Sequence, residues 1–134
     1  MDIIACSNTW FLRWSRALGF DLSRFHIITE RNELTQAVVE VQKPDHIFFP
    51  HWNWTVPKAI HESVESVVFH IAPLPEGRGG SPIQNLILKG FQNAPLNSLR
   101  MTDSVDAGPV YFSDNLDLSG TLEEIFERAT PLIW

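Results

Sequence analysis

Residues 67–70 of this 134-residue chain read Val-Val-Phe-His, a short run of β-branched and aromatic side chains. Such runs favour β-strands, and near-continuous hydrophobicity is typical of parallel strands that are covered on both faces. Three similar runs come earlier in the chain, at residues 3–6, 25–29 and 46–49. The sequence therefore predicts a sheet whose strands are mostly parallel.

Helical patterns fill the segments between these runs. Apolar side chains recur at i, i+3 and i+7 within residues 10–18, and Gly19 follows as a stop signal. Residues 34–42 repeat the pattern, and Pro44 ends it. Only a short crossover joins the third run to the fourth. This order of elements predicts an α/β fold.

The second half of the chain predicts further elements. A capping box with Pro82 at the first helical position opens a helix over residues 81–89. Strands at 96–101 and 109–112 and a last helix at 121–129 follow. The apolar end, residues 131–134, is expected to pack against the chain's own sheet or against a second copy, as in a homodimer. With no repeat or linker, residues 1–134 form one predicted domain.

Composition bounds the function. Hydrophobic residues make up 44% of the chain, which excludes a disordered protein. The net charge of −6, with ten scattered Lys and Arg, argues against a nucleic-acid partner. The single Cys6 excludes an internal disulfide and a Cys-based zinc site. Because no segment reaches the ~18 apolar residues of a membrane helix and the start does not resemble a signal peptide, we expect a cytoplasmic protein without membrane contact.

Two segments are candidates for a site, because ligands of open α/β sheets bind at the carboxyl ends of the strands. The third run leads into an aromatic segment, residues 50–57, and the fourth ends at His70 before a glycine-rich loop. Taken alone, His70 fits a structural role, and the glycines fit simple turns. A phosphate site in the loop is a weaker alternative, since the spacings of a P-loop and of a dinucleotide fingerprint are absent.

The combined pattern is more specific. Residues 70–84 read His70-x-x-x-Leu74-Pro75-x-x-Arg78-Gly79-x-x-Pro82-Ile83-Gln84, and an Asp-x-Gly turn follows at Asp106-Ala107-Gly108. Over residues 44–112 the chain resembles the formyltetrahydrofolate-dependent formyltransferase family. The sequences of its motifs are most similar to those of small bacterial methionyl-tRNA formyltransferase-like and sugar N-formyltransferase-like members. This resemblance implies a single Rossmann-like domain with a mostly parallel sheet flanked by helices. It also implies N10-formyltetrahydrofolate as donor co-substrate and no metal.

The resemblance implies roles for individual residues. His70 would donate a hydrogen bond to the formyl oxygen, and Asp106 would favour the imidazolium form and accept the proton of the amine. Arg78 would meet an anionic group of the acceptor or hold the loop in shape. The cofactor's pterin ring would bind at Trp52, Trp54, Val56, Asp103 and Ala107, and the acceptor at Arg78, Gly79 and Gln84. Alternatively, the two tryptophans only cap the sheet.

Two positions depart from the family pattern. Val68 stands where the family has a catalytic Asn, and Ala72 stands where it usually has Ser. Because the Asn would be a second donor to the oxyanion, Val68 predicts a slow enzyme unless another donor reaches the site. The candidates for that donor are Asn53, Asn85 and His51, each of which also fits an ordinary surface role.

These features predict an N-formyltransferase acting on a small amine, with a nucleotide-linked amino sugar as the expected acceptor. Alternatives are a methionyl-tRNA or glycinamide ribonucleotide acceptor. Two further hypotheses are a folate- or nucleotide-binding module with weakened chemistry, and a shortened catalytic half that needs a partner chain to complete its sheet. The part of the chain before His70 is shorter than in most family members, which implies that one βα unit is missing and agrees with the last hypothesis.

Overall fold

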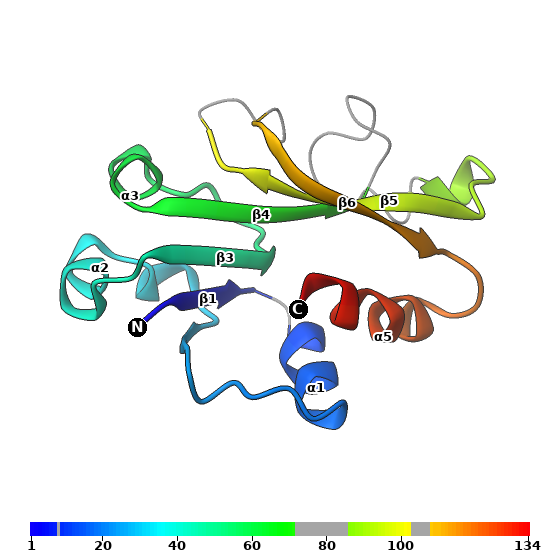
Figure 1. Cartoon of the computed structure of the whole chain (residues 1–134), viewed down its shortest axis with the longest axis horizontal. Coiled ribbons are helices and arrows are strands. Elements are labelled where there is room, and N and C mark those ends of the chain that lie inside the picture. The colour runs from blue at the N-terminus through cyan, green and yellow to red at the C-terminus, as the bar shows by residue number, and fades with distance from the viewer. Residues whose placement is uncertain (8, 72–85, 103–107) are drawn as a thin grey trace.

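The computed structural model describes residues 1–7, 9–71, 86–102 and 108–134. This part of the chain contains a six-stranded sheet in the order β2-β1-β3-β4-β5-β6 (Figure 1). Strands β2, β1, β3 and β4 are parallel, β5 pairs antiparallel with β4, and β6 pairs antiparallel with β5. The predicted α/β fold with a mostly parallel sheet is confirmed. The strands are β1 (Ile3–Cys6), β2 (His26–Ile28), β3 (His46–His51), β4 (Glu65–Ile71), β5 (Asn93–Arg100) and β6 (Val110–Asp117).

Four α-helices with described bounds accompany the sheet: α1 (Trp10–Ala17), α2 (Gln36–Gln42), α3 (Lys58–Ser63) and α5 (Leu122–Ile133). Gly19, with φ +83°, follows α1 as predicted. Helix α2 begins later than predicted. Its N-cap is Thr35, whose hydroxyl accepts a hydrogen bond from the Val38 N–H, and a separate 3-10 turn at Arg31–Glu33 precedes it. Of the predicted helix 81–89, residues 86–88 are helical, Lys89 already lies in a turn, and residues 81–85 lie outside the described residues.

Two helical features were not predicted, although the last predicted helix itself is confirmed. The crossover between β3 and β4 contains α3, whose six residues are too few for a periodic pattern to reveal. Helix α5 continues past the expected end at residue 129 and through Pro131 to Ile133. The Thr130 hydroxyl donates to the Phe126 carbonyl at 2.8 Å, and the next turn closes with Trp134 N donating to the Thr130 carbonyl at 3.3 Å.

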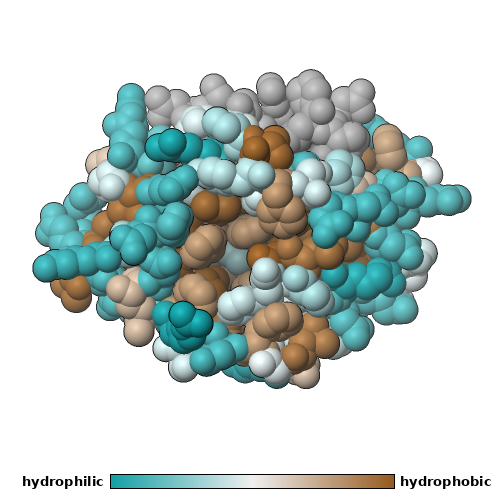
Figure 2. All heavy atoms as spheres, in the orientation of Figure 1, coloured by the Kyte–Doolittle hydropathy of each residue, from teal (hydrophilic) through white to brown (hydrophobic). Residues whose placement is uncertain are grey.

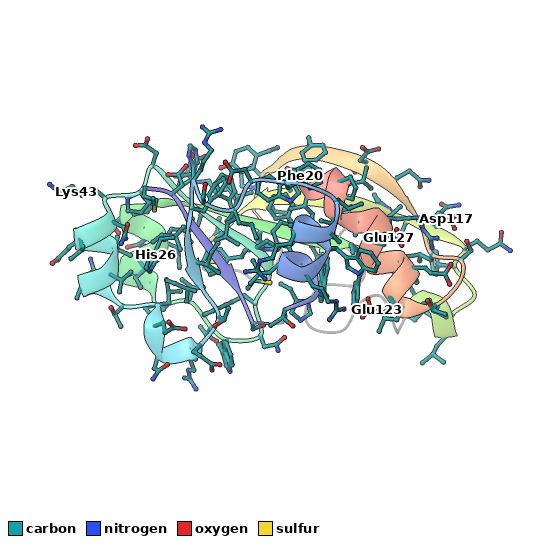
Figure 3. All side chains as sticks on the ribbon, turned by 90° about the horizontal axis from the view of Figure 1, so that it is seen from below. Phe20, His26, Lys43, Asp117, Glu123 and Glu127 are labelled. Carbon is teal, nitrogen blue, oxygen red and sulfur yellow. The ribbon has the colours of Figure 1, made fainter. Side chains whose placement is uncertain are left out.

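The sheet separates two apolar clusters because successive side chains along a strand point to opposite faces. On one face, Ile4 and Cys6 of β1 pack with α1 and α5. On the other, which we call the site face, Ile3, Ala5, Ile47, Phe49 and Val68 pack with α2 and α3. Helices α1 and α5 lie side by side (Figures 1 and 3).

The C-terminal residue packs against its own chain. The Trp134 ring stacks on Phe20 with centroids 5.0 Å apart and on Phe11 at 5.8 Å, and its Nε1 donates to the Ser15 hydroxyl at 2.9 Å. The end therefore packs against its own chain on the α1 side, and the alternative of a contact with a second copy stays a prediction. With Phe48 and Phe69 of the sheet, Trp134 borders an apolar hollow of about 230 Å³. Apolar side chains gather near the middle of the face in Figure 2.

Polar contacts tie together the amino-terminal ends of the strands. His46 Nε2 of β3 lies 3.2 Å from a Glu65 carboxylate oxygen of β4, and the Tyr111 hydroxyl of β6 donates to the same carboxylate. The hydrogen bond from Tyr111 holds the pKa of Glu65 below its ordinary value, helped by the charges of His46 and Arg100. Desolvation and the bond to Glu65 raise the pKa of Tyr111 to about 12.

Replacement of Trp134 by Ala is expected to lower the free energy of unfolding by about 2–3 kcal/mol, because a large aromatic contact is lost from a ring that is partly exposed. Chemical denaturation measures the change. Trp134→Phe keeps a ring against Phe20 and is the control, expected to lose less than half as much. Equal losses in the two variants would contradict a stabilising role for the stack.

Tyr111→Phe is expected to flatten the dependence of stability on pH at both ends. The lowered pKa of Glu65 stabilises the fold above the ordinary Glu range, and this contribution is lost as pH falls through the lowered value. The raised pKa of Tyr111 stabilises the fold below pH of about 10, and this contribution is lost as pH rises toward about 12. Thermal melts across pH, with Val110→Ala as control, test this; identical profiles for Tyr111→Phe and the parent would refute it.

Candidate active site at the end of β4

His70 lies at the carboxyl end of β4, one residue before the strand ends at Ile71. Its side chain is buried, with 6% of the residue exposed. Val68, two residues earlier, packs into the cluster of the site face, whereas Phe69 and Ile71 pack on the other face. Alternation therefore directs His70 to the site face. The structure confirms the predicted strand-end position of His70, and its catalytic role stays a prediction.

The aromatic segment after β3 borders the same face. Trp52 and Val56 pack with the cluster of the site face, and the Trp52 ring meets Phe49 edge to face at 6.0 Å. Trp54 contacts Trp52 at 4.9 Å with the rings nearly perpendicular. The predicted pterin-binding side chains Trp52, Trp54 and Val56 are thus brought together near His70's face of the sheet.

The indole N–H of Trp52 has an unusual environment. Its Nε1 atom is buried and has no hydrogen-bond partner within the described part of the chain. A buried donor without an acceptor costs about 1–3 kcal/mol, so native proteins seldom leave one in this state. The Trp52 N–H is therefore a buried polar group that the described part of the protein leaves unsatisfied.

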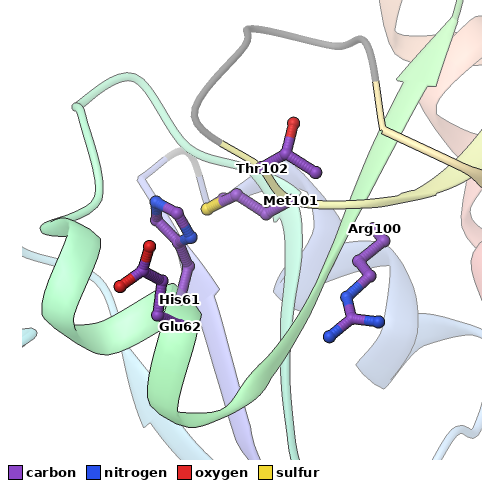
Figure 4. Close-up of a pocket in the computed structure, with 5 residues that line it drawn as sticks. All are labelled: His61, Glu62, Arg100, Met101 and Thr102. Carbon is purple, nitrogen blue, oxygen red and sulfur yellow. The ribbon is translucent and has the colours of Figure 1, made fainter.

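A pocket of about 280 Å³ opens between α3 and the end of β5 (Figure 4). His61 of α3 and Met101, just after β5, point toward one another across it (Figure 4). Met101 also packs against the cluster of the site face, and its backbone N–H donates to the Ser66 carbonyl at the start of β4. Thr102 borders the pocket beside the predicted Asp-x-Gly turn. Sequence reasoning missed His61 because it did not predict α3.

Gly108 closes that turn against β5. A Cβ atom at this position would overlap the Arg100 carbonyl oxygen and lie 2.9 Å from its carbon. The Arg100 N–H donates to the Pro109 carbonyl at 2.9 Å, which brings the two backbones close together. Only glycine fits this approach, which explains the residue type at the end of the Asp-x-Gly motif.

Several predicted site residues belong to two segments outside the described part of the chain. Asp103, Asp106 and Ala107 of the turn, and Arg78, Gly79 and Gln84 of the glycine-rich loop, lie outside the described residues, as do Ala72 and Asn85. Thr102, which precedes the turn, is beside the start of β4, about 16 Å along that strand from His70 at roughly 3.3 Å per residue. The pairing of Asp106 with His70 therefore stays a prediction.

The two other candidate donors are engaged with one another and with the end of β1. The Asn53 side chain hydrogen-bonds His51, while the Asn53 N–H donates to the Ser7 hydroxyl at 3.0 Å. That hydroxyl in turn donates to the His51 carbonyl at 3.1 Å. Burial lowers the pKa of His51 and the bond to Asn53 partly offsets this, so His51 favours its neutral form. These contacts give both residues a structural role in holding the loop to β1.

Across the described ranges, with their gaps at 8, 72–85 and 103–107, no group of three or more His, Cys, Asp and Glu side chains could hold a metal ion. None of the helices in the part of the chain that the structure describes has the length and hydropathy to span a bilayer.

Comparison with known proteins gives consistent relatives. No family model matches the sequence. The methionyl-tRNA formyltransferase of Rickettsia felis is 31% identical over 108 residues, which are 78% of this chain and 36% of that protein. The chain thus spans about a third of the length of this curated relative.

Solved structures extend the match over nearly the whole chain. A methionyl-tRNA formyltransferase from Clostridium thermocellum is 40% identical with a TM-score of 0.86, covering 98% of this chain and 60% of that one. HypX from Aquifex aeolicus, solved in complex with tetrahydrofolic acid, shares the fold at 20% identity with a TM-score of 0.74, over 98% of this chain and 25% of that one. Together with the strand-end His70 and the glycine-closed turn, these matches place the chain in the formyltetrahydrofolate-dependent formyltransferase family.

Proposed function

We propose that this chain is a formyltransferase domain that moves a formyl group from N10-formyltetrahydrofolate to a primary amine. The observation that carries the proposal is the 40% identity to a methionyl-tRNA formyltransferase over 98% of the chain, with a histidine at the carboxyl end of β4. Ligands of open α/β sheets bind at such ends.

The site face fits the donor. The pterin of a reduced folate is a flat heterocycle with carbonyl and ring-nitrogen acceptors. The Trp52–Trp54 pair and Val56 supply apolar surface for such a ring, and the buried N–H of Trp52 supplies a donor for one of its acceptors. Asp103 and Ala107 are proposed to contact the ring from the Asp-x-Gly turn.

The reaction requires a donor at the formyl oxygen. The neutral amine attacks the formyl carbon, and negative charge develops on the formyl oxygen in a tetrahedral intermediate. His70 donates a hydrogen bond to that oxygen. Asp106 takes the proton that the amine loses, directly or through water. The bond from carbon to N10 then breaks, N10 gains a proton, and tetrahydrofolate and the formylated amine leave.

For the acceptor, we favour the amino group of methionyl-tRNA, because the curated and solved relatives at 30% identity or more carry that activity in their names. A nucleotide-linked amino sugar is the acceptor expected from the resemblance of the motif sequences, and it has no support among these relatives. Arg78, Gly79 and Gln84 are proposed to contact the acceptor. Assays of the purified chain with methionyl-tRNA and with amino-sugar nucleotides in parallel would identify the acceptor; formylation of the sugar alone would overturn our choice.

Trp52→Phe is expected to weaken binding of 5-formyltetrahydrofolate, a stable analogue of the donor, by about 10-fold, the loss of one hydrogen bond from a buried donor. The same change removes an unsatisfied donor from the ligand-free protein, so its melting temperature should stay equal or rise. Calorimetric titration and thermal melts measure the two effects. Trp14→Phe, whose indole N–H bonds Glu123 instead, is the matched control. A lower melting temperature with unchanged affinity would show that the N–H serves the fold alone.

His70→Ala and Asp106→Asn are each expected to lower kcat by about 10²–10³-fold, the effect of removing one group that stabilises the transition state. Donor affinity should change little, since neither side chain is proposed to hold the pterin. Release of tetrahydrofolate in the presence of the acceptor measures turnover. If the parent chain binds the analogue but turns over no amine, the domain is a binding module, and the catalytic assignment fails.

A further inference from the structure

His70 lies opposite an amide. In the antiparallel pairing of β4 and β5, His70 is in register with Asn97. Directly opposed residues of such a pair point to the same face, with Cβ atoms about 4.5–5.5 Å apart. Asn97 is as deeply buried as its neighbour, with 5% of the residue exposed. An imidazole and a primary amide therefore lie side by side on the site face at the carboxyl end of β4.

The next pair along these strands is apolar. Val68 faces Leu99, and neither side chain can donate a hydrogen bond. Ser98, the residue between Asn97 and Leu99, points to the other face and bonds the backbone of Phe112, whose N–H donates to its hydroxyl at 3.1 Å. Of the described residues on these two strands, Asn97 is the one that presents an amide donor beside His70.

An asparagine at this place can serve two partners together. Its amide has two N–H donors and a carbonyl acceptor, so one group can bond within the protein while an N–H meets a ligand. A donor held on a buried strand is oriented before the reaction begins. The low dielectric of the interior also strengthens its effect on a developing charge.

Resting on the proposed formyl transfer, we propose that Asn97 is a second catalytic residue of this site. Its amide N–H donates to the formyl oxygen together with His70 while that oxygen carries negative charge. No bond to Asn97 forms or breaks: the charge appears when the amine attacks and disappears when the bond from carbon to N10 breaks. Asn97 thus supplies from β5 the donor that Val68 cannot supply from β4.

The decisive variants change Asn97 at nearly constant size. Asn97→Asp replaces the donor N–H with an acceptor oxygen, and Asn97→Leu removes all hydrogen bonding. Both are expected to lower kcat by about 10²–10³-fold with the KM for the folate donor changed less than threefold. Ser98→Ala, a buried polar position on the same strand with the opposite orientation, is the matched control and should keep the parent kcat. Thermal melts establish that each variant is folded.

A reciprocal exchange separates a catalytic role from a structural one. Adding Val68→Asn to Asn97→Leu places an amide one residue pair away on the same face. The double variant should have a kcat at least tenfold higher than that of Asn97→Leu alone. In the parent chain, Val68→Asn should raise kcat less than threefold, because a second donor is already present.

Four outcomes are informative. Loss of kcat in both Asn97 variants with rescue by Val68→Asn supports the proposal. Full activity of folded Asn97→Asp and Asn97→Leu would overturn it while leaving the formyl transfer intact. A large gain from Val68→Asn alone would also overturn it, since the site would then lack the second donor. If no amine is formylated by the parent chain, the proposed function itself fails, and that result is visible before any variant is compared.

Discussion

The alternation of side chains along β4 is the constraint on which the site depends. Val68 faces the cluster formed with α2 and α3, while Phe69 and Ile71 face α1 and α5. Since the period is two, a shift of one residue in the register of β4 would turn His70 toward the wrong helices and place Phe69 in the site. Burial on both faces makes that shift costly, because each apolar side chain would leave its own cluster. The packing that stabilises the sheet therefore also fixes the orientation of the candidate catalytic group.

Much of this fold could be predicted from local pattern. The runs at residues 3–6, 25–29, 46–49 and 67–70 are all strands, and the capping box at Thr121 and Glu124 does begin a helix. What could not be predicted depends on tertiary contacts. Helix α3 is too short to show a period, and α5 passes through Pro131 because its last turn packs its aromatic end against α1. The direction of β5 relative to β4 could not be predicted either, because the sequence of one strand does not reveal which strand it pairs with or in which direction.

The same division applies to the site. The strand-end position of His70 and the proximity of Trp52 to Val56 followed from the order of elements and from motif spacing. Asn97 did not, although it lies in a predicted strand. Only the register with His70 distinguishes it from other polar residues. Asn53 and His51 were reasonable candidates by loop position, yet their mutual hydrogen bond gives them a structural task. Sequence identifies the kinds of groups available, and pairing decides which of them meet.

The tryptophans are divided by the sheet. Trp10, Trp14 and Trp134 belong to the side of α1 and α5, while Trp52 and its perpendicular neighbour Trp54 belong to the site face. Two indoles 4.9 Å apart at 82° are close enough for their electronic transitions to couple. The protein thus carries in the candidate site a coupled indole pair, whose exciton circular dichroism depends on the distance and angle between the two rings. A change in the arrangement of the candidate site would therefore alter a signal that the unlabelled protein already contains.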